Sequence, residues 1–388
     1  MNIQNVISKR TGGPQLDADR NLEGLGFKQR RADKIIPEDP LILEWLKQIQ
    51  DTATTNKDLL FSEEENQIHT FNNSLVAMAF IVKGEKERAE RILDFYAEAT
   101  DKDNDQAMLQ NFYYKGKARG FFQSVSPKEI GGKEYYYNMG NSDRWMGDIA
   151  WLLLAYKYYQ QTYNSEKYQE ITRLLKDLLI SWYKDADDGG YVQHGWRSGD
   201  KRLHENHGHP EGNIDCYAVL KICGEDEYAE KIKAWLDKSI SGDKLPLDLY
   251  TWRVLAYGPE AVNLLDIPEF DLRYRKTLRV NNQPVAGFYH GPEEIENIWL
   301  DGTGHIACAY ITLGDKQRGY FYSNQLDAYI TERDIKGVKV HVLPYTANKS
   351  GGYNWVDTNK GFVSVGAWYI FSKNGFNPLK LEKVPVNY

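Results

Sequence analysis

The stretch Gly224-Glu225-Asp226-Glu227-Tyr228-Ala229 ends one apolar run and begins a charged one, and it recurs along the 388-residue chain. Its counterparts are Gly84-Glu85-Lys86-Glu87-Arg88-Ala89, Gly314-Asp315-Lys316-Gln317-Arg318-Gly319 and, with asparagine for glycine, Asn164-Ser165-Glu166-Lys167. Glycine and asparagine tolerate the left-handed conformation that ends a helix, and an acid then suits the positive end of the next helix. The sequence therefore predicts a chain built from repeated helical hairpins.

Apolar residues at helical spacing extend this pattern to twelve predicted helices. They cover residues 40–54, 69–83, 86–100, 145–163, 166–184, 212–223, 226–239, 247–256, 259–266, 302–313, 316–332 and 363–373. Long loops with short strands are expected at 111–137, 187–210 and 333–358, which are rich in Gly, Tyr, His and Asn. Residues 1–39 are predicted to form an irregular lead-in, and residues 40–388, which no linker divides, a single domain.

Twelve helices in hairpins predict an all-α fold, a closed (α/α)6 toroid with the long loops and short strands at the mouth of its cavity. The nearly apolar segments 149–156 and 306–313 fit inner helices, and the charged segments 86–100 and 316–332 fit outer ones. An open solenoid of helix pairs is the alternative, which the irregular loop lengths disfavour.

This order of inner helix, short glycine turn and outer helix, with aromatic loops before the inner helices, resembles the six-hairpin glycosidase superfamily. The resemblance covers most of the chain from about residue 40 and is one of architecture, without a diagnostic motif. It implies carbohydrate chemistry, because that superfamily includes inverting glycoside hydrolases, polysaccharide lyases, sugar epimerases and phosphorylases. A fold alone does not choose among these activities.

The composition of the chain indicates which classes of ligand or partner it can bind. Aromatic residues make up 13% of the chain, with 27 Tyr and 10 Trp, which suits either helix packing or a groove for sugar rings. The net charge is −7 and no basic cluster alternates with aromatic residues, so we expect no nucleic-acid partner. No apolar stretch is long enough to span a bilayer and no signal peptide is visible, so no membrane partner is expected; the compartment and oligomeric state stay open.

Acids and aromatic residues gather in the loops before three predicted inner helices. Asp148 follows Trp145 at the start of one helix, and Asp301 follows Trp299 at another. In the stretch 203–215, Glu211 and Asp215 are four residues apart, which places them on one face of a helix start. Each of these acids also fits a purely structural role at a helix N-terminus. Asp248 is a weaker candidate of the same kind, and the corresponding positions in 67–73 are amides.

Glycosidic cleavage requires one carboxylic acid to protonate the leaving oxygen and a second carboxylate to activate water or attack carbon. The leading hypothesis is an inverting glycosidase in which Glu211 is the acid and Asp148 or Asp301 is the base, with Asp215 as a further candidate. The expected stacking surfaces and hydroxyl partners are Trp145, Trp196, Trp299, Trp355, Tyr137, His207 and His209.

Two other functions remain open. The histidines at 204, 207 and 209 motivate a lyase or epimerase, in which proton abstraction by His or Tyr replaces acid-assisted hydrolysis. A non-catalytic glycan-binding protein is the second alternative. The same histidines lack a familiar metal-ligand spacing, so no metal or other cofactor is predicted.

Overall fold

The computed structural model describes residues 30–52, 58–63, 67–102, 112–130, 133–137, 143–242 and 244–382, with only the backbone at 127–130 and 133–137. Helices dominate this part of the chain, which confirms the prediction of a mostly helical fold. The α-helices are α3 (Pro40–Thr52), α4 (Thr70–Val82), α5 (Lys86–Glu98), α7 (Met146–Tyr163), α8 (Gln169–Ser181), α9 (Pro210–Ile222), α10 (Asp226–Ser239), α11 (Leu247–Tyr257), α12 (Asp266–Phe270), α13 (Leu300–Thr312), α14 (Lys316–Leu326) and α15 (Val363–Asn374).

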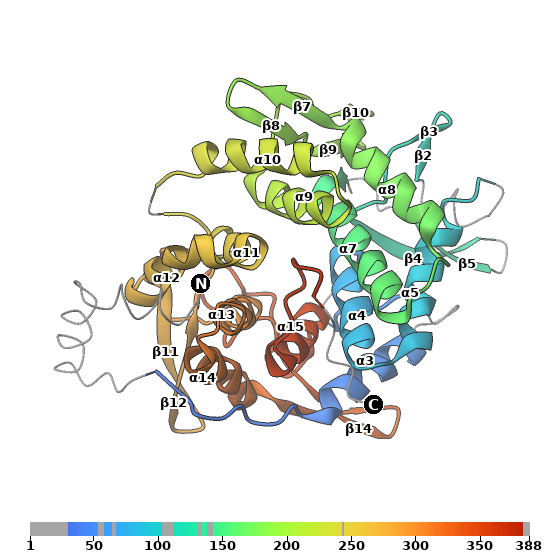
Figure 1. Cartoon of the computed structure of the whole chain (residues 1–388). Helices are drawn as coiled ribbons and strands as arrows, with labels where there is room; N and C mark the ends of the chain where they lie inside the picture. Colours follow the sequence, from blue (N-terminus) through green and yellow to red (C-terminus); the bar gives the residue numbers. More distant parts are fainter. Residues whose placement is uncertain are drawn as a thin grey trace.

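Helices α4, α7, α9, α11, α13 and α15 each pack against the next in this order, and α15 packs back against α4 (Figure 1). Their side chains are buried on nearly every face, as the apolar sequence of inner helices requires. Helices α5, α8, α10 and α14 pack outside the inner helices that precede them. A 3-10 helix, η1 (Gly258–Leu265), packs in the same way against α11, and α3 contacts α15.

The hairpin turns have the backbone that the repeated sequence predicts. Gly84, Gly224 and Gly314 have φ of 72°, 78° and 86°, and Asn164 has φ of 46°. At the last copy the Asp315 carboxylate accepts a hydrogen bond from the backbone N–H of Arg318 at 3.2 Å, at the start of α14. Left-handed residues at these four turns are therefore confirmed.

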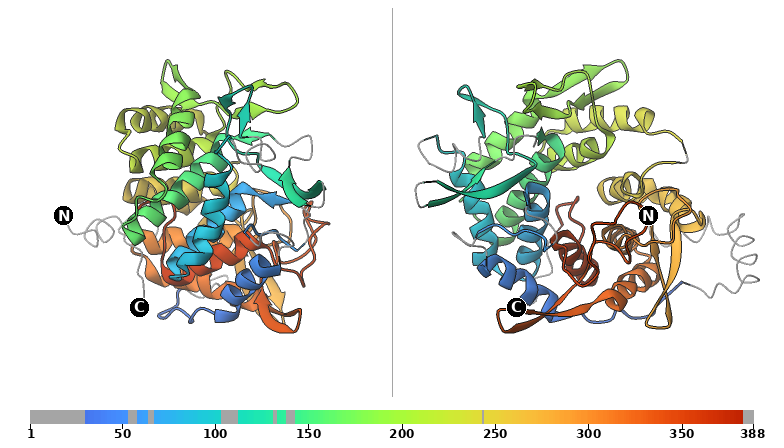
Figure 2. Two further views of the ribbon diagram at one scale, coloured as in Figure 1. Left: turned by 90° about the vertical axis from the view of Figure 1, so that its right-hand side faces the viewer. Right: turned by 180° about the vertical axis from the view of Figure 1, so that it is seen from behind.

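Short antiparallel strands occur in the loops, and most of them lie on one side of the helices in the left view of Figure 2. Two three-stranded sheets have the orders β1-β4-β5 and β10-β9-β6, and the other strands form two-stranded hairpins. The strands are β1 (Ile68–His69), β2 (Tyr113–Tyr114), β3 (Lys117–Ala118), β4 (Ser124–Ile130), β5 (Lys133–Tyr137), β6 (Arg144–Trp145), β7 (Tyr183–Ala186), β8 (Gly189–Val192), β9 (Gly195–Arg197), β10 (Arg202–Leu203), β11 (Arg275–Val280), β12 (Gln283–Phe288), β13 (Thr331–Ile335) and β14 (Val338–Val342).

Several boundaries differ from the sequence prediction. The helix expected at 166–184 ends at Ser181, because Tyr183 already pairs with Val192 in the β7/β8 hairpin. The helix expected at 316–332 ends at Leu326, and the chain continues through a 3-10 turn into β13. The segment expected as a helix at 259–266 is the 3-10 helix η1.

The β11/β12 hairpin was not predicted at all. Its turn is Asn281-Asn282, with φ of 48° and 64°. Two positive φ angles in a two-residue turn match the twist of a β-hairpin, and asparagine tolerates such angles. The Asn281-Asn282 pair is therefore the feature of the sequence that could have predicted this hairpin.

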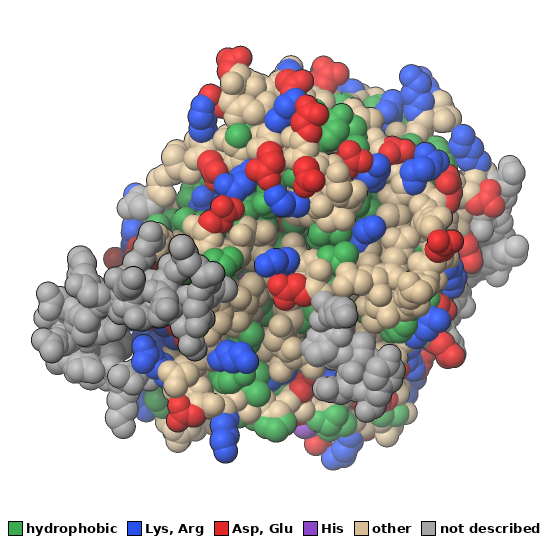
Figure 3. All heavy atoms as spheres, in the orientation of Figure 1, with side chains coloured by type: hydrophobic (Ala, Val, Ile, Leu, Met, Phe, Trp, Pro, Cys, Tyr) green, Lys and Arg blue, Asp and Glu red, His purple; other side chains and the backbone are tan. Residues whose placement is uncertain are grey.

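On the face seen in Figure 3, acidic and basic side chains are interspersed over the helices. Within the described ranges, none of the helices has both the length and the hydropathy that crossing a membrane requires.

Candidate active site

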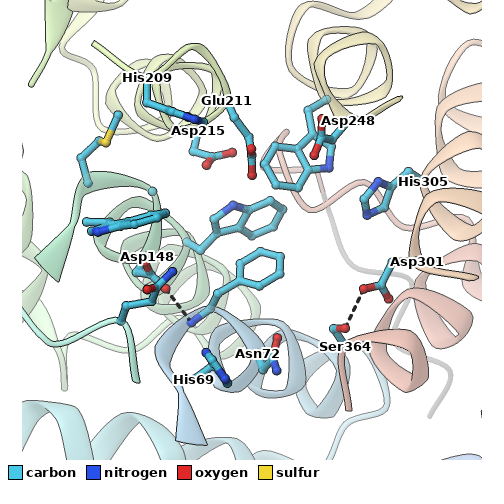
Figure 4. Close-up of a pocket in the computed structure, with 18 of the residues that line it drawn as sticks. His69, Asn72, Asp148, His209, Glu211, Asp215, Asp248, Asp301, His305 and Ser364 are labelled. Carbon is cyan, nitrogen blue, oxygen red and sulfur yellow. Dashed lines mark hydrogen bonds between the residues drawn. The ribbon is translucent and has the colours of Figure 1, made fainter. Parts of the chain in front are cut away.

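A cavity of about 330 Å³ lies where the first turns of the six inner helices meet. Near its start, each of these helices contributes one polar residue to the cavity wall: Asn72, Asp148, Glu211, Asp248, Asp301 and Ser364 (Figure 4). Aromatic side chains complete the wall, among them Phe71, Trp145, Trp151, Trp252, Trp299 and Tyr345. Carboxyl groups among aromatic rings, in a concave site, are the usual form of a polar ligand pocket.

Glycines beside the acids allow the helix starts to come this close. A Cβ added at Gly147, next to Asp148, would lie 3.2 Å from Asp215 Oδ2. One added at Gly302, next to Asp301, would lie 2.4 Å from Cε3 of Trp299. The pairing of acid and glycine in the sequence therefore reflects crowding around the cavity.

Asn213 fixes the start of α9. Its amide oxygen accepts from the backbone N–H of Val192 at 2.8 Å, and its amide nitrogen donates to the carbonyls of Val192 and His209, both at 3.0 Å. Asn73 repeats this arrangement in α4, with Leu60 and His69 in the corresponding places. These amides hold the backbone of His69 and His209, which precede the two helices and line the cavity.

Glu211 lies among other carboxyl groups in the cavity. Desolvation raises its pKa well above the usual value, and the nearby carboxyls of Asp248 and Asp148 raise it further. Figure 4 shows Asp215 on one side of Glu211 and Asp248 on the other. The pKa of Asp215 is also raised well above its ordinary value by burial and by Glu211, and its Oδ1 has no hydrogen-bond partner among the described residues.

Asp148 and Asp301 have a different environment. Burial raises the pKa of each to about 7. The charged form of Asp148 is favoured by His69 and by the backbone N–H of Phe71, 3.2 Å from its Oδ1. The Ser364 hydroxyl donates to Asp301 Oδ2 at 2.7 Å. Asp148 thus has more groups that stabilise an ionised carboxylate than Asp301 has.

Asp248 also stands beside a histidine. Nε2 of His290 lies 3.8 Å from Asp248 Oδ2, and the backbone N–H of Leu249 donates to Oδ1 at 2.8 Å. Burial raises the pKa of the Asp248 carboxyl, and both contacts partly offset this effect because they favour the ionised form. Asp248 therefore belongs to the same cluster of buried acids as Glu211 and Asp215.

Two histidines face the cavity with buried ring nitrogens that have no hydrogen-bond partner among the described residues: His194 and His305. Burial lowers the pKa of His305 well below the usual value, and it lowers that of His194 to about 4, with neighbouring histidines contributing. Both rings are therefore neutral at pH 7, and each offers one donor and one acceptor.

The structure brings most of the predicted site residues together. The cavity is lined by Asp148, Glu211, Asp215, Asp301, Trp145, Trp299 and His209. Trp196 lines a smaller hollow beside it. Trp355 and His207 line neither: Trp355 is 47% exposed with its ring 5.3 Å from that of Tyr345, and His207 stacks on His204 at 4.9 Å. The side chain of Tyr137 lies outside the described part of the structure.

Sequence reasoning missed or underrated several lining residues: Asn72, Asp248, Ser364, His69, His194, His290 and His305. A positional signal was available for some of them, because Glu211, Asp248, Asp301 and Ser364 are each the second residue of an inner helix. His305 lies deeper in an apolar helix, and only its small neighbours Gly302 and Gly304 mark the space around it.

A metal site does not emerge from the described ranges, where no three His, Cys, Asp or Glu side chains are grouped to hold an ion. The histidine rings at 194, 204 and 207 stack with interplanar angles of 21° to 34°, so their nitrogens do not converge on one point.

No family model matches the sequence, and no curated protein matches it. Solved structures do match the fold. A wild-type glycosidase aligns over 87% of this chain and 96% of its own, with a TM-score of 0.55 and 11% identity. A D-mannose isomerase aligns over 86% of this chain and 96% of its own, with a TM-score of 0.57 and 13% identity. A family 76 glycoside hydrolase from a bovine Bacteroides thetaiotaomicron strain aligns over 86% of this chain and 76% of its own, with a TM-score of 0.50 and 11% identity. The chain therefore has the glycosidase-like (α/α)6 fold that its repeated hairpins resemble.

Proposed function

We propose that this protein is a carbohydrate-active enzyme, a glycoside hydrolase that works in the cavity of an (α/α)6 toroid. The observation that carries the proposal is the convergence of five carboxyl groups and several tryptophans on one cavity. Four of these carboxyls come from the first turns of inner helices, and the fifth, Asp215, lies one turn further along α9. Glycosidases among the structures that share the fold support it.

Glu211 is the proton donor in this proposal. A general acid must be protonated at the working pH, and burial together with neighbouring carboxyls raises the pKa of Glu211 well above its usual value. It also keeps partial exposure to the cavity, so a glycosidic oxygen can reach it.

Asp148 is the base. It comes from α7, the helix next to α9, and both acids line the same cavity. In an inverting enzyme a water molecule stands between the base and the anomeric carbon, and Asp148 activates that water in this proposal. Asp301, with one hydroxyl donor, is the alternative base.

The reaction follows from these roles. Glu211 transfers its proton to the glycosidic oxygen as the bond from that oxygen to the anomeric carbon breaks. Asp148 accepts a proton from water, whose oxygen forms the new bond to the anomeric carbon. Glu211 then regains a proton from solvent and Asp148 loses one, which restores the enzyme. The indoles of Trp145 and Trp299 provide apolar faces for the sugar ring.

The test is turnover by matched variants. Glu211→Gln and Asp148→Asn keep side-chain size and remove the proton transfers, so each is expected to lower kcat by at least about a hundredfold on neutral oligosaccharides. Lys201→Gln, on an exposed turn, is the control that should retain activity. NMR of the first product should show an inverted anomeric centre. Full activity of Glu211→Gln would end the assignment, and binding without any product would favour a glycan-binding protein.

A sugar isomerase or epimerase is the second candidate, favoured by His305. This histidine is 1% exposed, it is neutral, and neither of its nitrogens has a hydrogen-bond partner among the described residues, which suits a general base. A D-mannose isomerase is among the structures that share the fold. Proton abstraction from a monosaccharide in D₂O would introduce deuterium at carbon, whereas hydrolysis would not. A lyase would instead produce an ultraviolet-absorbing double bond.

A further inference from the structure

A second hollow, of about 230 Å³, adjoins the cavity. It is lined by Asp143, Trp145, His194, Gly195, Trp196, Arg197 and His204. Trp145 and His194 belong to the walls of both spaces, so the two adjoin at these side chains.

The β10-β9-β6 sheet builds this hollow. Arg144 and Trp145 of β6 pair with Trp196 and Gly195 of β9. Gly195 has φ of 140°, and a Cβ there would lie 2.0 Å from the carbonyl oxygen of Arg144. Only glycine fits at this position, so the strands approach closely and present backbone, with no side chain, at the wall of the hollow.

Trp196 is held in place within this wall. Its indole is 6% exposed, the guanidinium of Arg119 lies 4.3 Å from the ring centre, and the ring of Tyr114 lies 5.5 Å away. The small part of this side chain that reaches the hollow is therefore rigid, and it offers an apolar contact at little conformational cost.

The polar groups of the hollow suit hydroxyl groups. The ring nitrogens of His194 have no hydrogen-bond partner among the described residues, and the lowered pKa values of His194 and His204 keep both rings neutral at pH 7. A neutral imidazole both donates and accepts, as a hydroxyl does.

Two charged residues line the hollow, and their charges are opposite in sign. Arg197 brings one positive charge, with its Nε 3.6 Å from Asp200. Asp143 brings one negative charge, and its Oδ1 accepts from the backbone N–H of Ser198 at 2.8 Å. A wall with one charge of each sign favours an uncharged ligand over a uronate or phosphate.

We infer that this hollow is a second sugar subsite, which binds an uncharged ring linked to the sugar in the main cavity. The inference rests on the proposed glycosidase function and deepens it, because it makes the natural substrate at least a disaccharide. Trp196, His204 and Arg197 are then specificity residues that contact the second ring.

The experiment compares two kinds of substrate. Neutral malto-, cello-, manno- and xylo-oligosaccharides fill both spaces, whereas monosaccharide glycosyl fluorides fill only the cavity. Arg197→Ala, His204→Ala and Trp196→Phe are expected to lower kcat/KM for the cleaved oligosaccharide by about three- to tenfold, and to leave the fluoride within twofold of wild type.

Arg202→Ala is the matched control. Arg202 pairs with Arg197 across β10 and β9, and its guanidinium also lies 3.6 Å from Asp200, but it is outside both spaces and its side chain is 74% exposed. Loss of the ion pair alone should therefore affect Arg202→Ala and Arg197→Ala equally. If the two variants behave alike, or if the fluoride and oligosaccharide rates fall together, the subsite is overturned. A loss confined to uronate-containing oligosaccharides would overturn the uncharged ligand.

Binding separates this inference from the proposed function. Calorimetric titration of Glu211→Gln protein with the same neutral oligosaccharides should show tighter binding than with the monosaccharides, and Arg197→Ala should remove the difference. Absence of turnover by wild-type protein, with this binding difference intact, would overturn the hydrolase and keep the subsite. Turnover by wild-type protein, with oligosaccharides and monosaccharides bound equally tightly, would overturn the subsite and keep the hydrolase.

Discussion

Asp148 Oδ1 accepts a hydrogen bond from the backbone N–H of Phe71 at 3.2 Å, which joins the first turns of α7 and α4. A helix-terminal N–H has no partner within its own helix, so it is free to stabilise a carboxylate on the neighbouring one. The same position on α9 carries Gly212, and the acid there is Glu211, which has Asp215 and Asp248 beside it. Two acids at equivalent helix starts therefore have different tendencies to ionise.

This difference predicts the pH dependence of the enzyme. Asp148 must be ionised to act as a base, and its pKa is raised to about 7, so kcat/KM should fall as the pH drops below about 7. Glu211 must be protonated, so kcat/KM should fall again as the pH rises through its raised pKa. A bell-shaped profile is expected from initial rates between pH 4 and 10. An acid limb near pH 4 would show that Asp148 is not the base.

Asp248→Asn should move the alkaline limb of that profile. Asp248 raises the pKa of Glu211 through like-charge repulsion, so removing its charge lowers the pKa and shifts the limb to lower pH. The acid limb, set by Asp148, should move much less. Glu205→Gln, at an exposed loop position, is the control for a general change of charge. An unchanged alkaline limb would mean that Asp248 does not act on the acid.

Asp301→Asn should stabilise the folded protein above pH 7. Burial raises the folded-state pKa of Asp301 from 3.8 to about 7, so the folded state binds the proton more tightly than the unfolded chain. Stability is then fully present below about pH 4 and is lost as the pH rises through 7, by at most about 4 kcal/mol. Asparagine cannot ionise, so its Tm should exceed that of wild type at pH 8 and match it near pH 4. A lower Tm for the variant at pH 8 would contradict a buried, charged carboxylate.

Asn213→Ala should destabilise the start of α9. The change leaves the N–H and C=O of Val192 and the carbonyl of His209 without their amide partner in a buried position. Unpaired buried groups of this kind lower the free energy of unfolding by about 1–3 kcal/mol. Urea unfolding of the variant and of wild type measures this loss. Asn359→Ala, at an exposed site, should cost far less. Equal losses from the two changes would show that the Asn213 contacts contribute nothing specific.

Gly224→Ala should cost about 1 kcal/mol through backbone strain alone, because Gly224 has φ of 78° and a Cβ there would meet no atom within 4 Å. Gly199→Ala is the matched control, since Gly199 has equally open surroundings without a positive φ. Urea unfolding of both variants isolates the left-handed conformation. A neutral Gly224→Ala would remove the physical basis for reading glycine as the hairpin turn.

The sequence by itself determined the features that depend on near neighbours. A left-handed residue after each apolar run, and an acid at the start of the next helix, are local preferences of a few residues, and they predicted the hairpins and the turns at Gly84, Asn164, Gly224 and Gly314. The same local pattern pointed to Asp148, Glu211 and Asp301, because each lies in the first turn of an apolar helix.

Only the tertiary structure decided what surrounds those acids. The packing of α15 against α4 brings Ser364 to the cavity that Asn72 also lines, although nearly three hundred residues separate them in the chain. It also placed His305 and Asp248 in the wall and left His207 and Trp355 outside it. Cavity position, burial and pKa depend on contacts between distant segments, and no spacing within a single helix or loop encodes them.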